Sequence, residues 1–215
     1  MNSKYNLLLT DSLKYSITKI LPGIMGLISV ILIIKMIGTE EYGKYSILNS
    51  FIMTLTAFSG GWLNQSLLRY YPGNNDRKKI ENQAFLCLVI SAALGILILL
   101  GIYIIKRDSF FQHANTLLVI FFYVAVLLYQ FQISVYRSQI RPSMVILISS
   151  IQSILALIMP LFFIYYFGSK VKYIILGLSI AYLVPNIKNL LFKFFSIQRI
   201  LQFKKASYSL LFEFF

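Results

Sequence analysis

The chain has 215 residues, of which 58% are hydrophobic and 13% are charged. Soluble domains are about one quarter charged, so this composition excludes an ordinary soluble domain and predicts a membrane protein. The formal net charge of +13 does not indicate nucleic-acid binding, because the cations lie between apolar runs and do not gather on a soluble face.

Apolar segments follow one another along the chain and predict an all-α, polytopic transmembrane helical bundle. A bilayer core about 30 Å thick needs roughly 20 apolar residues per helix. The uncharged segments that exceed this length are 45–68, 82–105, 109–136 and 142–169. A first segment, 20–34, and a last segment, 173–187, are shorter, and residues 13–18 and 189–192 can extend them. We therefore predict six spans, forming one lobe over residues 1–195.

The C-terminal part of the chain has a different pattern. Residues 193–207 alternate cations with Phe, Ile and Leu at helical intervals, which is typical of a basic amphipathic helix on a membrane surface. The end of the sixth span is the alternative interpretation of this segment. Residues 207–215 are apolar again and predict the start of a seventh span.

The distribution of Lys and Arg predicts the orientation of the lobe. When the segments between spans are assigned to alternate sides, fourteen of the cations fall on the N-terminal side and six on the other. Cytoplasmic loops carry the excess of Lys and Arg, so both ends of the six-span lobe are expected in the cytoplasm. The expected connections are short, at 38–43, 72–81, 106–113, 137–143 and 168–172, and could not hold a soluble catalytic domain.

The sequence supplies few groups for catalysis. It has one histidine, His113, one cysteine, Cys87, and seven acidic residues, without a metal-ligand spacing on one helix face. Glu40 and Glu41 are adjacent, so on a helix their side chains diverge by about 100°, and a role at a helix start or in a loop is expected. We predict no enzymatic activity, no metal site and no cofactor.

Helix-breaking residues near cations mark the first and sixth spans as candidate walls of a transport pathway. Broken helices free backbone groups, which is tolerated where protein or water satisfies them, and such helices often line transporter pathways. The predicted break and pathway residues are Pro22, Gly23 and Gly26 in the first span and Pro185 in the last. The neighbouring cations are Lys19 and Lys188.

The second span ends in polar residues that have two interpretations. Gly60 and Gly61 precede Trp62, and Asn64, Gln65 and Arg69 follow. In one interpretation the glycines allow close packing and the arginine reaches the lipid headgroups. In the other, Asn64, Gln65 and Arg69 contact substrate. Two further polar groups, Gln130 with Gln132 and the patch 149–153, are expected mainly to hydrogen-bond between helices.

Two short motifs carry a resemblance to a known family. The first is "IGTEEYGKYSI" at 37–47, and the second is "GGWLNQSLLRYYP" at 60–72. Together with the preceding apolar helix they resemble the start of the polysaccharide and O-antigen flippases, the Wzx-like branch of the multidrug/oligosaccharidyl-lipid/polysaccharide exporter superfamily. Gly38, Tyr42, Gly43 and Tyr45 match the pattern that joins the first two helices in that family, and residues 68–71 match its basic-aromatic stretch.

The resemblance implies a transport function. Members of that family have two six-helix lobes around a cavity that opens alternately to either side of the bacterial inner membrane. The implied substrate is an oligosaccharide on undecaprenyl diphosphate, and the implied partners are a polysaccharide polymerase and a chain-length regulator. Cations near the pathway would offset the charge of the diphosphate. The candidates are Lys19, Lys35, Arg69 and Lys188, with Asn64 and Gln65 as polar contacts.

Other functions stay open at this point. Within the superfamily the alternative is a drug/cation antiporter, which usually needs a membrane carboxylate that the predicted spans lack at mid-depth. A membrane enzyme would need larger loops or clusters of catalytic residues. A non-transporting accessory subunit is a further alternative. The sequence covers one lobe of such an exporter, so we expect either a fragment of a longer protein or an assembly of two copies.

Overall fold

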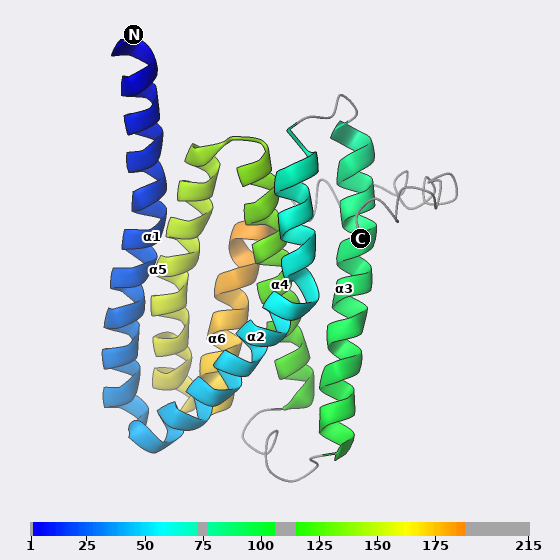
Figure 1. Cartoon of the computed structure of the whole chain (residues 1–215). Coiled ribbons are helices and arrows are strands. Elements are labelled where there is room, and N and C mark those ends of the chain that lie inside the picture. Colours follow the sequence, from blue (N-terminus) through cyan, green and yellow to red (C-terminus); the bar gives the residue numbers. More distant parts are fainter. Residues whose placement is uncertain (1, 73–76, 106–114, 188–215) are drawn as a thin grey trace.

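The computed structural model describes residues 2–72, 77–105 and 115–187, and these residues form an all-helical fold (Figure 1). Its helices are α1 (Asn2–Ile37), α2 (Thr39–Tyr70), α3 (Arg77–Ile105), α4 (Thr116–Ser138), α5 (Pro142–Phe167) and α6 (Val171–Leu183), followed by the short 3-10 helix η1 (Val184–Asn186). Successive helices run in opposite directions, so α4 and α6 point the same way. The predicted all-α class is confirmed.

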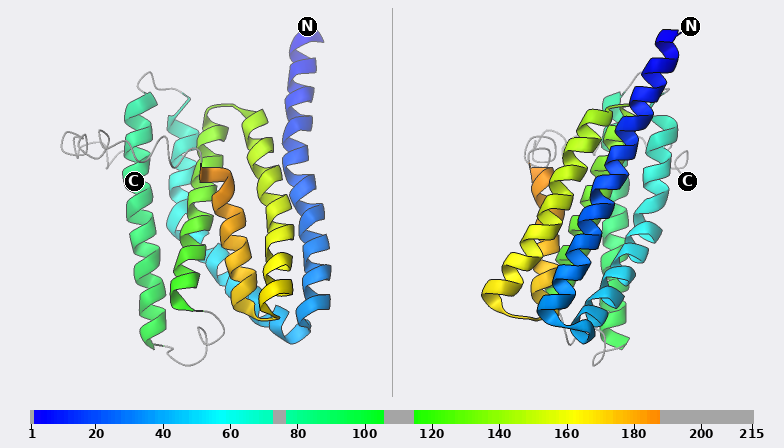
Figure 2. Two further views of the ribbon diagram at one scale, coloured as in Figure 1. Left: turned by 180° about the vertical axis from the view of Figure 1, so that it is seen from behind. Right: turned by 90° about the vertical axis from the view of Figure 1, so that its left-hand side faces the viewer.

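The helices form a row with one helix lying across it. In Figures 1 and 2 the row is α1, α5, α6, α4 and α3, and α2 crosses one face of it. α5 packs against α1 and α6, while α4 packs against α6 and α2. Fully buried side chains include Ile52 of α2, Phe122 and Tyr123 of α4, and Ile174 and Ile175 of α6. The core therefore lies between α2, α4 and α6, and α1 and α3 form the two edges.

Length and composition identify membrane-span candidates among the described residues. The segments long and apolar enough to cross a bilayer are Lys19–Ile37, Gln83–Ile105, Thr116–Ser138 and Pro142–Phe167. Val171–Asn186 is apolar but shorter. α2 has 32 residues but is not apolar enough to be among the four. These four helices indicate a multi-pass membrane protein, whereas six spans and their orientation stay predictions.

α1 corrects the predicted break in the first span. Pro22 lies inside a continuous helix of 36 residues, and Gly23 and Gly26 are also helical. A proline removes one backbone hydrogen bond, and here the helix continues past that loss. A Cβ added at either glycine would meet no atom within 4 Å, so these glycines do not mark a close helix contact within the described part of the chain. Their proposed place beside a pathway stays a prediction.

The predicted connection 38–43 is also wrong in its extent. Gly38 alone separates α1 from α2, and its φ of 85° is one that L-residues rarely adopt. α2 then begins at Thr39, so Glu40 and Glu41 occupy its first turn. Acidic side chains in the first turn stabilise a helix by interacting with its dipole. Gly43 lies inside this helix. The family motif therefore encodes a sharp corner followed at once by a helix.

Lys44 completes the electrostatics of this corner. Its Nζ lies 2.7 Å from Glu41 Oε1 and 2.9 Å from Glu40 Oε1. The hydrogen bond to Glu41, followed by that to Glu40, raises the pKa of the Lys44 ammonium above its ordinary value. One cation thus holds both carboxylates that stand next to each other in the sequence, so their role is to stabilise the helix start.

The last described helix changes type at Pro185. α6 ends at Leu183 and η1 follows as a single 3-10 turn. Pro185 has no N–H with which to continue the α-helical bonding. The Asn186 side chain bonds back to the preceding turn, because its Nδ2 donates to the Tyr182 carbonyl at 2.8 Å.

Several predictions fall on residues outside those described. They are the basic amphipathic segment 193–207, the start of a seventh span at 207–215, the connection 106–113 and the candidate cation Lys188. The division of the chain into these segments stays a prediction.

Candidate functional site

Helix α2 has two different faces. One face is buried in the core, with Leu48, Ile52, Leu55, Leu63 and Leu67 each at most 6% exposed. These positions recur at helical intervals. The buried face packs mainly against α4 and α3, which fixes the rotation of α2 about its own axis. Its other face is therefore held on the outside of the described lobe.

The outer face of α2 carries a polar stripe. The stripe consists of Ser50, Thr54, Phe58, Gly61, Gln65 and Arg69. The spacing of four, four, three, four and four residues keeps these side chains on one side of a helix. All of them are exposed except Gly61, which is half-buried. We call this set the α2 stripe; four of its members are polar or charged, whereas Phe58, which is 78% exposed, is apolar.

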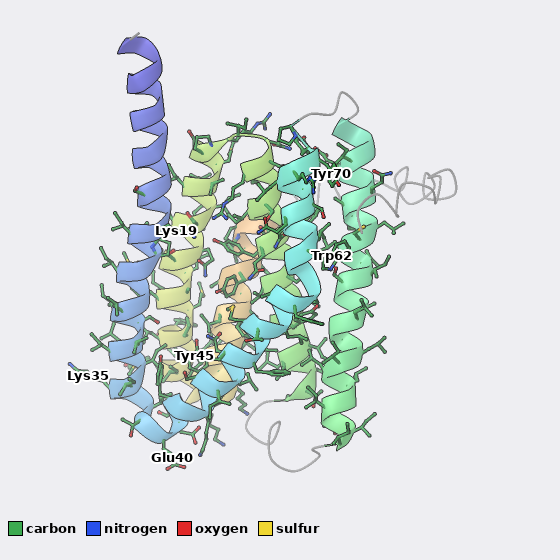
Figure 3. All side chains as sticks on the ribbon, viewed as in Figure 1. Lys19, Lys35, Glu40, Tyr45, Trp62 and Tyr70 are labelled. Atoms are coloured by element: carbon green, nitrogen blue, oxygen red, sulfur yellow. The ribbon has the colours of Figure 1, made fainter. Side chains whose placement is uncertain are left out.

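The middle of α2 contains a bend. Figure 1 shows the first half of the helix slanting across the bundle and the second half rising alongside α3 and α4. Trp62 lies near this change of direction in Figure 3, and its Nε1 donates to the Ser59 carbonyl at 2.7 Å. Ser59 Oγ also donates to the Leu55 carbonyl at 2.8 Å. Gly60 and Gly61 follow, and kinks commonly occur at such serine and glycine pairs.

Tyr123 ties the bend to two other helices. Its hydroxyl lies 2.8 Å from Ser59 Oγ on α2 and donates to the Ser91 carbonyl on α3 at 3.0 Å. A Cβ at Gly95 would collide with the Tyr123 ring and hydroxyl, so the tyrosine lies directly on the α3 backbone. This contact was not predicted from the sequence. The pairing of one glycine with one tyrosine from another helix has no local sequence signal.

A second polar cluster joins the upper ends of α2, α3 and α4. The buried Tyr71 donates through its hydroxyl to Glu81 Oε1 at 3.1 Å. Gln139 Nε2 donates to the same hydroxyl at 3.1 Å and approaches Glu81 Oε1 at 3.4 Å. The basic-aromatic end of the second motif thus contributes Tyr71 to a structural junction, which the sequence did not indicate.

The predicted cations among the described residues are Lys19, Lys35 and Arg69, and they lie on different parts of the lobe. Lys19 and Lys35 are both exposed on α1, and sixteen residues of helix place them about 24 Å apart along its axis. In Figure 3, Lys35 points away from the bundle at the opposite end of the lobe from Tyr70. α1 and α2 meet at Gly38 and diverge above it. Lys19 and Arg69 therefore stand on different helices.

The polar residues predicted on the second span divide between its faces. Gln65 and Arg69 belong to the α2 stripe, whereas Asn64 is half-buried and lies about 100° away from Gln65. The Arg69 guanidinium carbon is 5.5 Å from the centroid of the Tyr70 ring. Gly60 packs tightly against Leu127, as the packing interpretation expects, whereas the exposed Gln65 and Arg69 fit either interpretation, so contact with substrate stays a prediction.

The patch at 149–153 bonds within its own helix. Ser149 Oγ donates to the Ile146 carbonyl at 3.1 Å, and Ser153 Oγ donates to the Ser149 carbonyl at 2.6 Å. These two hydroxyls therefore do not form the hydrogen bonds between helices that we expected. Hydroxyls that return to the preceding turn are a common alternative for serine inside a helix.

The described residues contain no group of three or more His, Cys, Asp or Glu side chains that could hold a metal ion. The charged member of the α2 stripe is Arg69, and its polar members are the Gln65 amide and the Ser50 and Thr54 hydroxyls. Such groups can bind an anionic or hydroxyl-rich ligand by charge and hydrogen bonding.

Comparison with known proteins assigns the family. The family model described as polysaccharide biosynthesis protein matches residues 8–214, nearly the whole chain. Curated proteins and solved structures gave no match. The proteins of the matching family are membrane transporters of the flippase type and not enzymes. The expected resemblance is confirmed: the chain belongs to the polysaccharide biosynthesis protein family.

Proposed function

We propose that this chain forms a lobe of a flippase that moves an undecaprenyl-diphosphate-linked oligosaccharide across the bacterial inner membrane for polysaccharide synthesis. Transport proceeds by alternating access, with the α2 stripe lining the pathway. Family membership supports the general function. The α2 stripe is the observation that carries the more specific proposal.

The physical argument concerns the surroundings of α2. Exposed side chains on the edge helices are strongly apolar, such as Leu27 on α1 and Leu97 on α3, which are 69% and 64% exposed. Those faces suit lipid. Polar side chains within a span are costly in hydrocarbon and usually face protein or a water-filled cavity. The exposed Ser50 hydroxyl and Gln65 amide therefore suit a pathway better than lipid, whereas the Thr54 hydroxyl already donates to the Ser50 carbonyl at 2.9 Å.

Arg69 gives the stripe a charged end. A guanidinium can bind a diphosphate through two parallel hydrogen bonds, and its charge offsets the cost of moving that group out of water. With the N-terminus in the cytoplasm, Arg69 lies on the side where the lipid-linked substrate is made. The sugar chain would then extend along the hydroxyl and amide groups further down the stripe.

Replacing Arg69 tests this role. In cells that express the full-length protein as their sole copy, Arg69→Gln should reduce surface polysaccharide about tenfold, the loss expected for one charge-assisted hydrogen bond. Arg141→Gln is the matched control, because Arg141 is also exposed but lies at the start of α5, away from the stripe. Protein in the membrane fraction should be unchanged in both variants.

The outcomes separate the proposal from its rivals. Normal polysaccharide in Arg69→Gln at normal protein level would contradict the role of the stripe. Unchanged polysaccharide after deletion of the whole gene would contradict the flippase proposal itself. If deletion instead raises sensitivity to cationic drugs, the drug/cation antiporter of the same superfamily becomes the better assignment.

Six spans and a cytoplasmic N-terminus are part of the proposal. A reporter enzyme fused after residue 75 should behave as cytoplasmic, and one fused after Ser169 as periplasmic, because the cations concentrate on the first side. Alkaline phosphatase and green fluorescent protein fusions measure this directly. The reverse pattern would overturn the topology and would place Arg69 on the wrong side for substrate entry.

A further inference from the structure

Two amide side chains in the interior have polar atoms without a partner. Gln132 on α4 is 9% exposed and Asn186 in η1 is fully buried. Gln132 Nε2 and Asn186 Oδ1 make no hydrogen bond to any group in the described part of the chain. A buried polar group that is left unpaired lowers stability, so such groups in a protein need a specific explanation.

The helix register brings these two amides to the same level. The Tyr182 ring of α6 packs on α4, with its centroid 5.2 Å from that of Tyr129 and 6.1 Å from that of Phe122. α4 and α6 run in the same direction (Figure 1). Gln132 follows Tyr129 by three residues and Asn186 follows Tyr182 by four, about one helical turn in each case. η1 packs against α4, so both amides lie one turn beyond the tyrosine pair.

The two free atoms are complementary. Asn186 Nδ2 is already used, because it donates to the Tyr182 carbonyl at 2.8 Å. This bond fixes the amide and leaves Oδ1 as an acceptor, whereas Gln132 Nε2 is a donor. A simple anion would use only the donor, and a cation only the acceptor. A hydroxyl group both accepts and donates, so it can pair with either atom.

We propose that Gln132 and Asn186 form a subsite for a hydroxyl of a neutral sugar, with Tyr129 and Tyr182 as the aromatic surface beside it. The inference rests on the proposed function and assigns to this subsite the sugar part of the lipid-linked substrate. It is separate from Arg69, which serves the diphosphate.

Access to the subsite requires η1 to separate from α4. The lower part of α6 is held firmly, since a Cβ at Gly177 would lie 2.5 Å from the Pro160 nitrogen of α5. At the upper end Pro185 cannot donate a backbone hydrogen bond, and the α-helix has already ended at Leu183. The proposed opening therefore concerns the segment that carries Asn186.

A stability measurement tests whether the Gln132 amide serves ligand binding or holds the fold together. Gln132→Leu removes an unpaired donor, so it should raise the midpoint of thermal unfolding of the full-length protein by about 2–4 °C. Gln130→Leu is the matched control, since Gln130 is half-buried and lies on another side of α4. A lower midpoint for Gln132→Leu alone would show that the amide holds the fold together and would overturn the inference.

A binding measurement with two lipids tests the ligand. Full-length protein in nanodiscs is titrated with undecaprenyl diphosphate, either bare or carrying one N-acetylglucosamine. The wild type and Gln130→Leu should bind the sugar-bearing lipid about tenfold more tightly, a ratio that corresponds to 1.4 kcal/mol. Gln132→Leu and Asn186→Ala should lose this preference and keep the affinity for the bare lipid.

The remaining outcomes distinguish the two proposals. If the wild type binds both lipids equally, or if Gln132→Leu keeps the preference, the sugar subsite is wrong while the flippase assignment stands. If the wild type binds neither lipid, the proposed substrate is wrong and the subsite falls with it.

Discussion

Gly177→Ala should destabilise the protein by about 1–3 kcal/mol, the usual cost of forcing an extra carbon into a packed interior. A Cβ at this position would lie 2.5 Å from the Pro160 nitrogen and 2.7 Å from the Met159 carbonyl carbon. Both are backbone atoms of α5, so no side-chain rotation can relieve the collision. α5 and α6 would have to move apart along one of the most extensive helix contacts of the fold.

The single cysteine provides the measurement. Cys87 is fully buried in α3, so its thiol reacts with a maleimide dye only when the protein unfolds on heating. Gly101→Ala is the control, because a Cβ there meets no atom within 4 Å and alanine favours a helix interior over glycine by about 1 kcal/mol. Equal midpoints for Gly177→Ala and the wild type would contradict the close crossing of α5 and α6.

Gly95→Ala should have an effect of similar size, about 1–3 kcal/mol, for a different reason. Its Cβ would collide with the Tyr123 ring, which lies on the α3 backbone. Moving the ring would also break the hydroxyl bonds to Ser59 and to the Ser91 carbonyl. The same thermal unfolding assay should show a clear loss of stability.

A double-mutant cycle checks the cause of this loss. In a Tyr123→Leu background the ring is absent, so Gly95→Ala should cost much less than in the wild type. Tyr123→Phe alone should cost about 1–3 kcal/mol, because it removes the hydroxyl that contacts Ser59 Oγ and donates to the Ser91 carbonyl. An equal cost for Gly95→Ala with and without Tyr123 would show that the contact with the ring is not responsible.

The sequence predicted the number and order of the described helices because apolar run length is a local property. Segment 45–68 lies within α2, and the next two connections after α4 fall where charged and glycine residues occur, at 137–143 and 168–172. The errors concern residues whose effect depends on context. Pro22 did not end α1. Gly43 was predicted to lie in the connection after Gly38, but it lies inside α2.

The candidate site was predictable only in part. Gln65 and Arg69 were singled out because polar residues in a span are unusual, but Ser50 and Thr54 were not. Their place in the α2 stripe depends on how Leu48, Ile52 and Leu55 rotate the helix against α4, which is a tertiary contact. For the same reason Gln132 and Asn186 could be seen as polar residues in the sequence, but not as buried amides with unpartnered atoms on α4 and η1.

The fluorescence of Trp62 can report on the bend of α2. Trp62 is the one tryptophan of the chain, and its indole N–H is bonded to the Ser59 carbonyl where the helix changes direction. Any motion that straightens α2 must break this bond and change the polarity around the indole. Within this chain the tryptophan emission therefore comes from one known point, and a spectral shift on adding substrate would report the movement of this helix without an introduced probe.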